Sequence, residues 1–387
     1  MVIDGNGRTP PFGDRRIREL PEKLPVFRKL HLSKPPPCRF DRIGRRSPAV
    51  FSARRHCGTF CSIAPTSAAR TLNANPLVAA LHPFAPDAST SYLRWREQKL
   101  AHYPRRVEDL IVEVRDPRNL RESEAGKIRD LCGTANMAVY ASPLSDVTDK
   151  DIPRRLGERL GLACLDANLL ADDDGISSIE VAPEKSARGY IPYSSQRLLW
   201  HTDGYYNAPQ RRIRAFILHC VRPAAAGGEN HVLDHEIAYM LLRDADPEYV
   251  KALSAPDAMT IPARADNTSV LRGAETGPVF SVDPSSGALH MRYTARTRSI
   301  EWRPDETTRA AVQMLGRILD ADSPHVLVLR LAGGQGLVCN NVLHNRSAFT
   351  DDPAPGMARL VYRARYSDRI AGVTPAQAGA RCRQFPE

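Results

Sequence analysis

Long apolar runs are missing from this sequence of 387 residues. No stretch approaches the roughly 18 apolar residues that a membrane-spanning helix requires, so an integral membrane protein is excluded. Residues 1–5 carry no continuous apolar segment either, and a secretory signal peptide is therefore not predicted. Aromatic residues are few, at 6%, but the hydrophobic share of 42% is enough for a sizeable buried core.

Closely paired cysteines are also absent. The eight cysteines are scattered along the chain and include no C-x-x-C pair. This pattern predicts neither a disulfide framework nor a zinc knuckle, and a reducing cytoplasm is the expected location.

Acidic residues are scarce near the N-terminus. Residues 1–70 hold 15 Lys and Arg against 5 Asp and Glu, a difference of +10 that equals the net charge of the whole chain. The remainder has no net charge, so we predict no specific nucleic-acid partner for it. Because the region is rich in proline and lacks apolar periodicity, we expect residues 1–86 to be a basic, disordered leader. Its role is left open between organelle targeting, nucleic-acid binding and a dispensable segment.

Regular patterning begins at residue 87. Residues 87–175 form a mixed α/β part, with helices expected at 92–100, 121–133 and 150–161 and strands at 110–114 and 138–140. Strands dominate residues 176–372, where we expect them at 178–182, 190–193, 213–221, 258–262, 278–282, 288–293, 325–331, 336–343 and 359–366. Further helices are expected at 235–244, 247–254 and 305–320.

Many short strands with a few helices indicate an α+β fold. We expect a double-stranded β-helix, or jelly roll, with flanking helices. Residues 87–175 and 176–372 would together form the catalytic domain, and residues 373–387 a C-terminal tail.

Three side chains suggest a metal site. On an extended strand His201 and Asp203 would point to the same side, and a lone histidine, His344, follows the predicted strand 336–343. Two histidines and one carboxylate form the facial triad that leaves positions open on Fe(II) for a co-substrate and O2. An H-x-D sequence is also common in turns, and buried histidines often only satisfy hydrogen bonds, so this pattern alone is weak.

The predicted strand 359–366 carries an arginine face. At a period of two, Arg359, Arg363 and Arg365 lie on one side, and apolar residues lie on the other. If this side faces the interior, it needs an anionic partner, and a dicarboxylate such as 2-oxoglutarate would provide one. The sequence alone leaves open which side is inside.

Three motifs in this order resemble the TauD/TfdA family of Fe(II)- and 2-oxoglutarate-dependent dioxygenases. They are Trp-His-Thr-Asp at 200–203, Asn-Val-Leu-His-Asn-Arg at 341–346 and Arg359-x-x-x-Arg363, and the resemblance covers roughly residues 180–370. It implies an oxidoreductase that hydroxylates a small molecule with O2 and releases succinate and CO2. Since a carboxylate, Asp203, fills the third ligand position, hydroxylation is favoured over halogenation.

The resemblance also implies roles for individual residues. His201, Asp203 and His344 would bind iron, Arg359 would pair with the C5 carboxylate of 2-oxoglutarate, and Arg363 would lie near its C1 carboxylate and an acidic group of the substrate.

At the family's second 2-oxoglutarate contact, a threonine, this chain has Asn230 after Gly227-Gly228-Glu229. The amide of Asn230 can still donate a hydrogen bond to that carboxylate.

Substrate contacts are less well specified. Tyr205, Tyr206 and Asn207 follow the first metal motif and, with Arg363, are candidates; the tyrosines could equally pack outside the sheets. Further candidates are the polar residues on and just after the predicted strand 288–293, His290, Arg292 and Arg296. His219, His231 and His235 are expected to be structural or exposed, because Asp234 is a better N-cap for the next helix than a metal ligand.

Two other functions fit part of the pattern. A zinc hydrolase could use the same three ligands, although the arginine strand argues against it. A non-catalytic binding module could act through the basic leader. The sequence predicts no membrane partner and leaves open whether the chain forms a homo-oligomer.

Overall fold

This computed structural model describes residues 82–85, 88–166, 174–187, 190–265, 270–297, 300–320 and 323–370. All of them belong to the second of two units into which the chain divides, Arg70–Glu387. The predicted tail at 373–387 and most of the predicted leader lie outside the described residues. In the part that the structure describes, no helix is both long and apolar enough to cross a bilayer.

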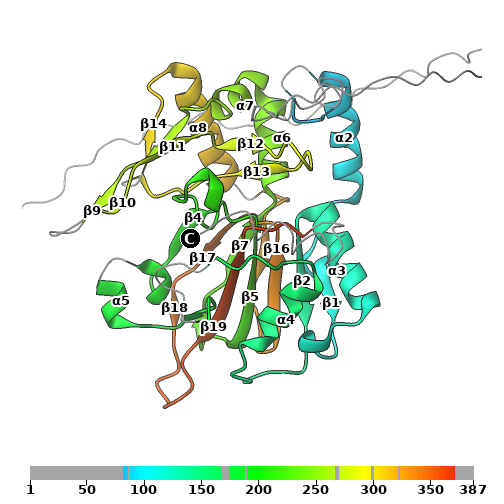
Figure 1. The fold of residues 1–387 in the computed structure, drawn as a ribbon, viewed down its shortest axis with the longest axis vertical. Coiled ribbons are helices and arrows are strands. Elements are labelled where there is room, and N and C mark those ends of the chain that lie inside the picture. The colour runs from blue at the N-terminus through cyan, green and yellow to red at the C-terminus, as the bar shows by residue number, and fades with distance from the viewer. Residues whose placement is uncertain are drawn as a thin grey trace, which may run out of the picture. The chain divides into compact units, whose positions relative to one another are not determined.

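Apart from α5, which was not predicted, the α-helices lie close to where the sequence places them; Figure 1 shows their arrangement. The α-helices of the described residues are α2 (Ser89–His102), α3 (Glu122–Ala135), α4 (Asp151–Arg159), α5 (Pro183–Ala187), α6 (His235–Ala245), α7 (Pro247–Leu253) and α8 (Glu306–Asp320). Short 3-10 helices are η1 (Val107–Leu110), η2 (Pro117–Asn119), η3 (Ile191–Tyr193) and η4 (Pro209–Arg211). Helix α6 is capped as predicted, since the side chain of Asp234 accepts a hydrogen bond from Glu236 N.

Two larger sheets form the body of the fold. The first has the order β1 (Ile111–Glu113), β2 (Met137–Ala141), β16 (Gln335–Cys339), β5 (Ala215–Arg222), β19 (Leu360–Tyr366) and β3 (Ser177–Ile179). The second has the order β15 (Leu327–Leu329), β7 (Asn230–Leu233), β17 (Leu343–Arg346) and β4 (Leu198–His201). Only β1 and β2 pair in parallel in these two sheets.

The remaining strands make small sheets. They are β8 (Met259–Ile261) with β11 (Glu275–Gly277) and β14 (Glu301–Trp302), β12 (Phe280–Val282) with β13 (Leu289–Met291), β9 (Arg264–Ala265) with β10 (Val270–Arg272), and β6 (Ala226–Gly227) with β18 (Phe349–Thr350). The described residues therefore combine helices with mostly antiparallel sheets, which confirms the α+β class.

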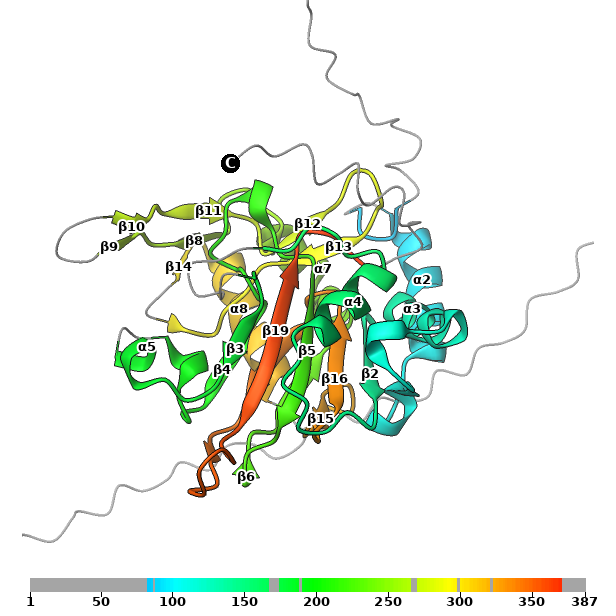
Figure 2. The ribbon, with the colours of Figure 1, turned by 60° about the horizontal axis from the view of Figure 1, so that its bottom comes forward.

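Alternation along β5 gives the six-stranded sheet two apolar faces. Phe216, Leu218 and Cys220 belong to a core shared with the four-stranded sheet. Ala215, Ile217 and Val221 belong to a second core. That second core also contains buried residues of α3 and α4, and both helices contact this sheet (Figure 2). The space between the two sheets is therefore lined by one face of β5 and of its neighbours.

The predicted leader ends earlier than expected. Residues 82–85 pack on the folded unit: Phe84 is buried, its ring meets Trp95 and Tyr239, and its carbonyl accepts a hydrogen bond from the Tyr239 hydroxyl. The predicted boundary at residue 86 is wrong by at least these four residues, because one buried aromatic ring holds the segment.

Two predicted strands and one cysteine differ from expectation. Residues 191–193 form the 3-10 helix η3, because Pro192 has a backbone angle that suits the start of a helical turn. The expected strand 336–343 breaks at Asn341, whose φ of 55° is left-handed. Cys132, Cys220 and Cys339 are free and buried, but Cys164 is disulfide-bonded, a bond that the scattered cysteines did not indicate.

Candidate metal centre

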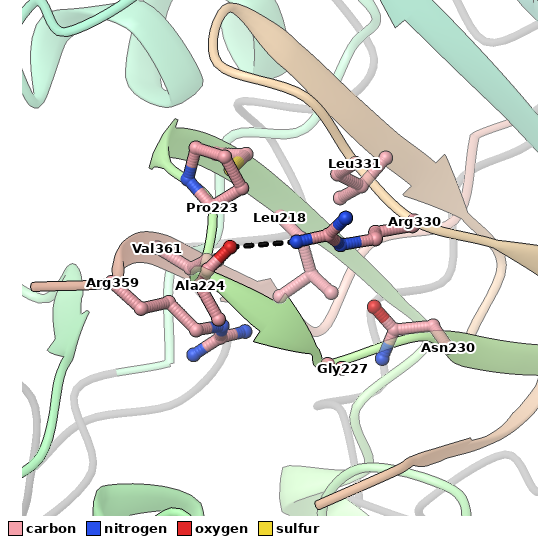
Figure 3. A pocket seen from close by; sticks show the side chains of 11 residues that line it. Leu218, Pro223, Ala224, Gly227, Asn230, Arg330, Leu331, Arg359 and Val361 are labelled. Carbon is pink, nitrogen blue, oxygen red and sulfur yellow. Dashed lines mark hydrogen bonds between the residues drawn. The ribbon is translucent and has the colours of Figure 1, made fainter. Parts of the chain in front are cut away.

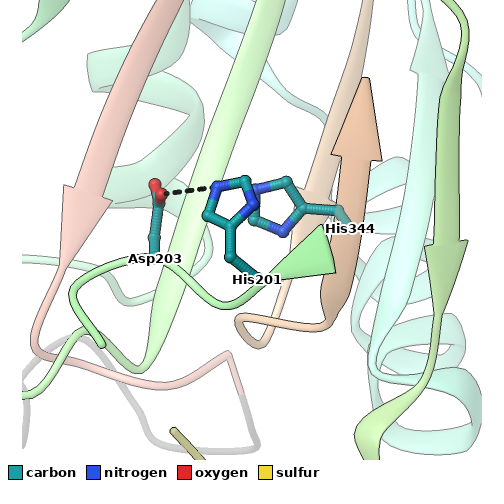
Figure 4. A group of neighbouring side chains, drawn as sticks. All are labelled: His201, Asp203 and His344. Carbon is teal, nitrogen blue, oxygen red and sulfur yellow. Dashed lines mark ion pairs between the residues drawn. The ribbon is translucent and has the colours of Figure 1, made fainter. Parts of the chain in front are cut away.

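Two histidines face each other on neighbouring strands. Strands β4 and β17 pair in a register that places His344 directly opposite His201. Opposed residues of an antiparallel pair project to the same face, and here the ring centroids are 4.2 Å apart (Figure 4). Both side chains are buried, at 7% exposure each.

Backbone carbonyls fix the orientation of both rings. His201 Nδ1 lies 2.8 Å from Leu199 O, and His344 Nδ1 lies 2.9 Å from Val342 O. A carbonyl only accepts, so each Nδ1 carries the proton and each Nε2 keeps a free lone pair. Burial lowers the pKa of both rings, that of His201 to about 3 with a further contribution from His344. Neutral imidazoles with a free Nε2 are the form that binds metals.

Asp203 completes the group from a turn rather than from the strand. Strand β4 ends at His201, so the predicted i, i+2 placement on one strand is wrong, yet Asp203 Oδ1 still lies 3.7 Å from His201 Nε2. Burial alone would raise the pKa of Asp203, but Arg363 and Arg365 outweigh it and the pKa falls below its usual value. Asp203 Oδ2 is buried and has no hydrogen-bond partner.

The three side chains fit a divalent metal. One potential ligand atom from each of His201, Asp203 and His344 lies within 4.8 Å of the others, and no other such group of His, Cys, Asp or Glu occurs among the described residues. Two imidazole nitrogens and one carboxylate match the donors of a facial triad. The unpartnered Oδ2 of Asp203 is an orphaned buried acceptor that a cation would satisfy.

Asn341 holds the turn that carries Asp203. Its Oδ1 accepts from Asp203 N at 2.8 Å, and its Nδ2 donates to Asp203 O at 3.0 Å and to Ile213 O at 2.7 Å. The sequence reasoning missed this residue. An asparagine between a strand and the candidate ligand His344 was the available signal, because Asn tolerates the left-handed conformation better than most residues.

The arginine side of β19 faces the space between the sheets. Leu360, Tyr362, Ala364 and Tyr366 belong to the core under α3 and α4, whereas Val361 belongs to the core shared with the four-stranded sheet. On the same side as Val361, Arg363 Nη1 lies 3.4 Å from Asp203 Oδ1. The question that the sequence left open is therefore answered, and the arginines point inward.

Arg359 directly precedes this strand and lies beside a small cavity. Figure 3 shows it with Asn230 of β7, Gly227 and Arg330 around that cavity. Arg359 is 7% exposed, its guanidinium lies 5.1 Å from the Phe349 ring, and its Nη1 has no hydrogen-bond partner. The amide of Asn230 donates to Asn345 O at 2.9 Å. Arg359 is thus a buried cation with a donor still available for an anion.

Tyr205 and Tyr206, which follow the candidate ligand Asp203, form hydrogen bonds with basic residues. Their rings pack edge to face, with centroids 5.1 Å apart. Tyr206 accepts a hydrogen bond from Arg365 Nη1 at 3.2 Å, and Arg365 also pairs with Asp166. Burial raises the pKa of Tyr205, which bonds with Thr294 and Arg296. The structure therefore brings Tyr206 to the arginine strand rather than leaving it outside the sheets.

The other histidines singled out in the sequence have structural partners. His219 Nδ1 lies 2.8 Å from the Tyr140 hydroxyl, His231 Nδ1 lies 2.9 Å from Asn345 Oδ1, and His235 Nε2 lies 3.0 Å from Leu289 O. None of them belongs to the group of His201, Asp203 and His344 that could bind a metal.

Comparisons with known proteins identify one matching family model and two similar curated proteins. Residues 102–365 match the model of the family described as "Taurine catabolism dioxygenase TauD, TfdA family". A uridine-5'-phosphate dioxygenase from Amycolatopsis sp. is 33% identical over 200 residues, which is 50% of this chain and 68% of the relative. A second protein of that name, from Streptomyces sp., is 28% identical over 249 residues, or 62% and 88% of the two chains.

Among solved structures, the non-heme iron oxygenase OrfP with Fe and alpha-ketoglutaric acid is 18% identical, with a TM-score of 0.48 over 70% of this chain and 90% of that one. The family match extends further toward the N-terminus than the motifs between 200 and 363 indicate, and it covers more than half of the sequence. The chain belongs to the TauD/TfdA family of Fe(II)- and 2-oxoglutarate-dependent dioxygenases.

Proposed function

We propose that His201, Asp203 and His344 bind Fe(II) in this enzyme. The observation that carries the proposal is the convergence of two neutral imidazoles and an ionised, partly unpartnered carboxylate within 4.8 Å. The carbonyls of Leu199 and Val342 keep each Nε2 free, so the ligands are oriented before metal arrives.

We infer that 2-oxoglutarate lies along β19. Arg363 lies on the inward side of β19, and Arg359 directly precedes this strand and lines the small cavity beside it. Arg359, with its unpaired Nη1, would hold the C5 carboxylate, with Asn230 beside it. Arg363, already at Asp203, would lie near the C1 carboxylate. Arginine suits both positions because it binds carboxylates through two parallel hydrogen bonds.

When bound, Fe(II) with 2-oxoglutarate and O2 supplies an oxidative decarboxylation that yields succinate and CO2 and drives substrate hydroxylation. The residues of the chain keep this chemistry in place. Phe216 packs against the His344 ring at 4.7 Å between centroids and helps to keep water out. Asp203 fills the third ligand position, which favours hydroxylation over halogenation.

We propose a phosphorylated nucleoside such as uridine-5'-phosphate as the substrate. The support is the name shared by two relatives, one of them 33% identical over two thirds of its own length. Tyr205 and Tyr206 would offer aromatic surface near the metal, and Arg363 would offer a cation to an acidic group.

We also propose that the two facing sheets are the halves of a double-stranded β-helix. Their shared core and mainly antiparallel pairing support this arrangement. Strands β1 and β2 join the same sheet as β16, which supports one catalytic domain spanning the regions 87–175 and 176–372.

The test measures metal binding and turnover in parallel. Anaerobic addition of Fe(II) and 2-oxoglutarate should produce a weak visible charge-transfer band, and uridine-5'-phosphate should stimulate O2-dependent succinate formation. His344→Ala should abolish both without loss of the folded circular-dichroism spectrum. His231→Gln, a histidine of the neighbouring strand β7, is the matched control and should retain both.

Arg359→Gln should raise the KM for 2-oxoglutarate at least tenfold and leave metal affinity unchanged. Normal turnover by His344→Ala would refute the ligand assignment. Tight zinc content with activity independent of O2 would favour a zinc hydrolase instead.

A further inference from the structure

A second cavity, of about 120 Å³, lies beside the loop that follows Asp203. It has room for several water molecules or one small oxyanion. Its polar lining residues are Asn207, Arg212, Thr276, Ser281, His290 and Arg292. No Asp or Glu is among the described residues that line it, so every side chain with a charge there is basic.

The polar wall of this cavity is one face of the hairpin β12–β13. Ser281 and His290 are directly opposite each other in the register of the two strands. Their neighbours Phe280, Leu289 and Met291 are each 1% exposed and face the core. Because side chains alternate along a strand, Ser281 and His290 share the other face, where they line the cavity.

Arg292 is held rigidly at this wall. Its guanidinium donates to three backbone carbonyls, those of Glu275 at 3.3 Å, Met259 at 2.6 Å and Gly277 at 2.9 Å. The side chain is 9% exposed, and its Nε is buried without a hydrogen-bond partner. The positive charge is therefore fixed by neutral groups and is not neutralised by a carboxylate in contact.

Arg212 brings a second cation that has no ionic contact. Within the described residues its guanidinium makes no hydrogen bond or ion pair. The nearby carboxylate of Asp283 is already engaged, 2.6 Å from Arg214. Burial and the neighbouring charge of Arg214 lower the pKa of Arg212. Burial and the charge of Arg212 in turn lower the pKa of His290 well below its usual value. The carboxylate of Asp283 acts in the opposite direction on Arg212, and that of Glu275 does so on Arg292, but among the described residues neither forms an ion pair with these guanidiniums.

One loop connects this cavity with the candidate metal site of His201, Asp203 and His344. Asn207 N donates to Gly204 O, next to Asp203, at 2.9 Å. At the other end of the loop, Ile213 O accepts from the same Asn341 that holds Asp203. A ligand at His201, Asp203 and His344 and an anion in the cavity would thus lie on two sides of a single loop, whose two ends are held by these hydrogen bonds.

We propose that this cavity is a phosphate subsite, a proposal that rests on the proposed function. Two guanidiniums, two hydroxyls, an amide and an imidazole offer the donors that a phosphate dianion accepts. The phosphate would come from a nucleotide substrate or from free inorganic phosphate, which have the same chemistry at this site.

Calorimetric titration of the full-length protein with inorganic phosphate at constant ionic strength tests the subsite. Arg212→Gln should weaken phosphate binding at least tenfold. Ser281→Asp places a carboxylate beside the arginines and should abolish binding. Arg309→Gln removes the same charge from an exposed position on α8 and should bind like the wild type; the leader contributes the same background in all variants. Unchanged phosphate affinity in both cavity variants would overturn the proposal.

Turnover distinguishes the two sources of phosphate. If the substrate's own phosphate occupies the subsite, Arg212→Gln raises the KM for uridine-5'-phosphate about tenfold, leaves the KM for 2-oxoglutarate unchanged, and inorganic phosphate competes with the substrate. If free phosphate occupies it, that KM is unaffected while phosphate binding is still lost. The Fe(II)–2-oxoglutarate absorption band does not depend on the cavity, so its absence would refute the proposed function separately.

Discussion

At the scale of single residues, the two adjacent asparagines 340 and 341 have different tasks. The side chain of Asn341 forms hydrogen bonds with both the backbone N–H and the backbone carbonyl of Asp203. Asn340 points elsewhere: it bonds Cys132 O and Asn136 Oδ1 near the end of α3, and both backbone groups of Ile370. One asparagine positions a candidate ligand, whereas the other ties the C-terminal part of the described chain to α3.

This division predicts different effects of two neighbouring substitutions. Asn341→Ala frees the turn that carries Asp203 and should reduce affinity for Fe(II) or Co(II) at least tenfold, measured by competition with a chelator. Asn340→Ala leaves buried groups of Ile370 unsatisfied and should cost about 1–3 kcal/mol of unfolding free energy in urea. Its metal affinity should stay normal. Equal metal affinities in the two variants would contradict the positioning role of Asn341.

A buried histidine predicts acid sensitivity. His219 is 0% exposed, and burial lowers its pKa from 6.5 to about 4. Between pH 6.5 and pH 4 the unfolded chain therefore binds a proton that the folded chain does not bind. The contribution of neutral His219 to the unfolding free energy is complete above pH 6.5 and is lost as the pH falls toward 4. The loss is on the order of 3 kcal/mol. His219→Gln should reduce the loss of unfolding free energy between pH 6.5 and pH 4, measured by urea unfolding at several pH values. His102→Gln, on the exposed side of α2, should leave this loss unchanged.

At the scale of secondary-structure elements, a buried ion cluster holds helix α2 to α6. Lys99 of α2 is 6% exposed, and its Nζ lies 2.6 Å from both Asp234 Oδ2 and Glu236 Oε2. Arg96 on the same helix pairs with Asp244 at 2.7 Å, but there both side chains reach solvent.

Removal of these two cations should have unequal effects. Lys99→Met removes the nearest cation from two buried carboxylates, with Arg369 Nη2 still 3.9 Å from Glu236 Oε1, and should cost about 3–5 kcal/mol of unfolding free energy. Arg96→Met, the matched variant, should cost less than about 1 kcal/mol. Urea unfolding of both measures the difference. A small effect for Lys99→Met would mean that Asp234 and Glu236 find other partners.

The elements also show how far sequence patterns reach. The periodicity of β19 correctly grouped its arginines on one side, but only its packing between two sheets showed that this side faces inward. Most helices were predicted because their caps and apolar spacing are local. The break at Asn341 was not predicted, because its cause is a contact with Asp203, which is far away in sequence. The candidate ligands were found by motif, but their opposed register comes from strand pairing.

At the scale of the whole molecule, the charge and the fold separate along the chain. The excess of +10 lies in residues 1–70, and residues 71–81 carry no charged side chain. The described part begins at His82, whose Nε2 bonds Gly287 O, and Phe84 is buried a few residues later. The charged segment and the folded unit can therefore be tested independently.

Two shortened chains make that test. A chain beginning at His82 should keep the melting temperature, the Fe(II)–2-oxoglutarate band and turnover, because it retains every contact between two described residues. It should lose any salt-dependent affinity for nucleic acid, since the remaining charges are balanced.

A chain beginning at Ala88 also loses Phe84 and the carbonyls of Pro83 and Ala85 that accept from Arg243. It should be about 3 kcal/mol less stable in urea, because the Phe84 ring no longer covers apolar surface and the buried Arg243 guanidinium loses two of its hydrogen-bond acceptors. If both chains were equally stable, residues 82–85 would contribute nothing to the fold. If the chain beginning at His82 kept its affinity for nucleic acid, the basic surface responsible would have to lie on the folded unit.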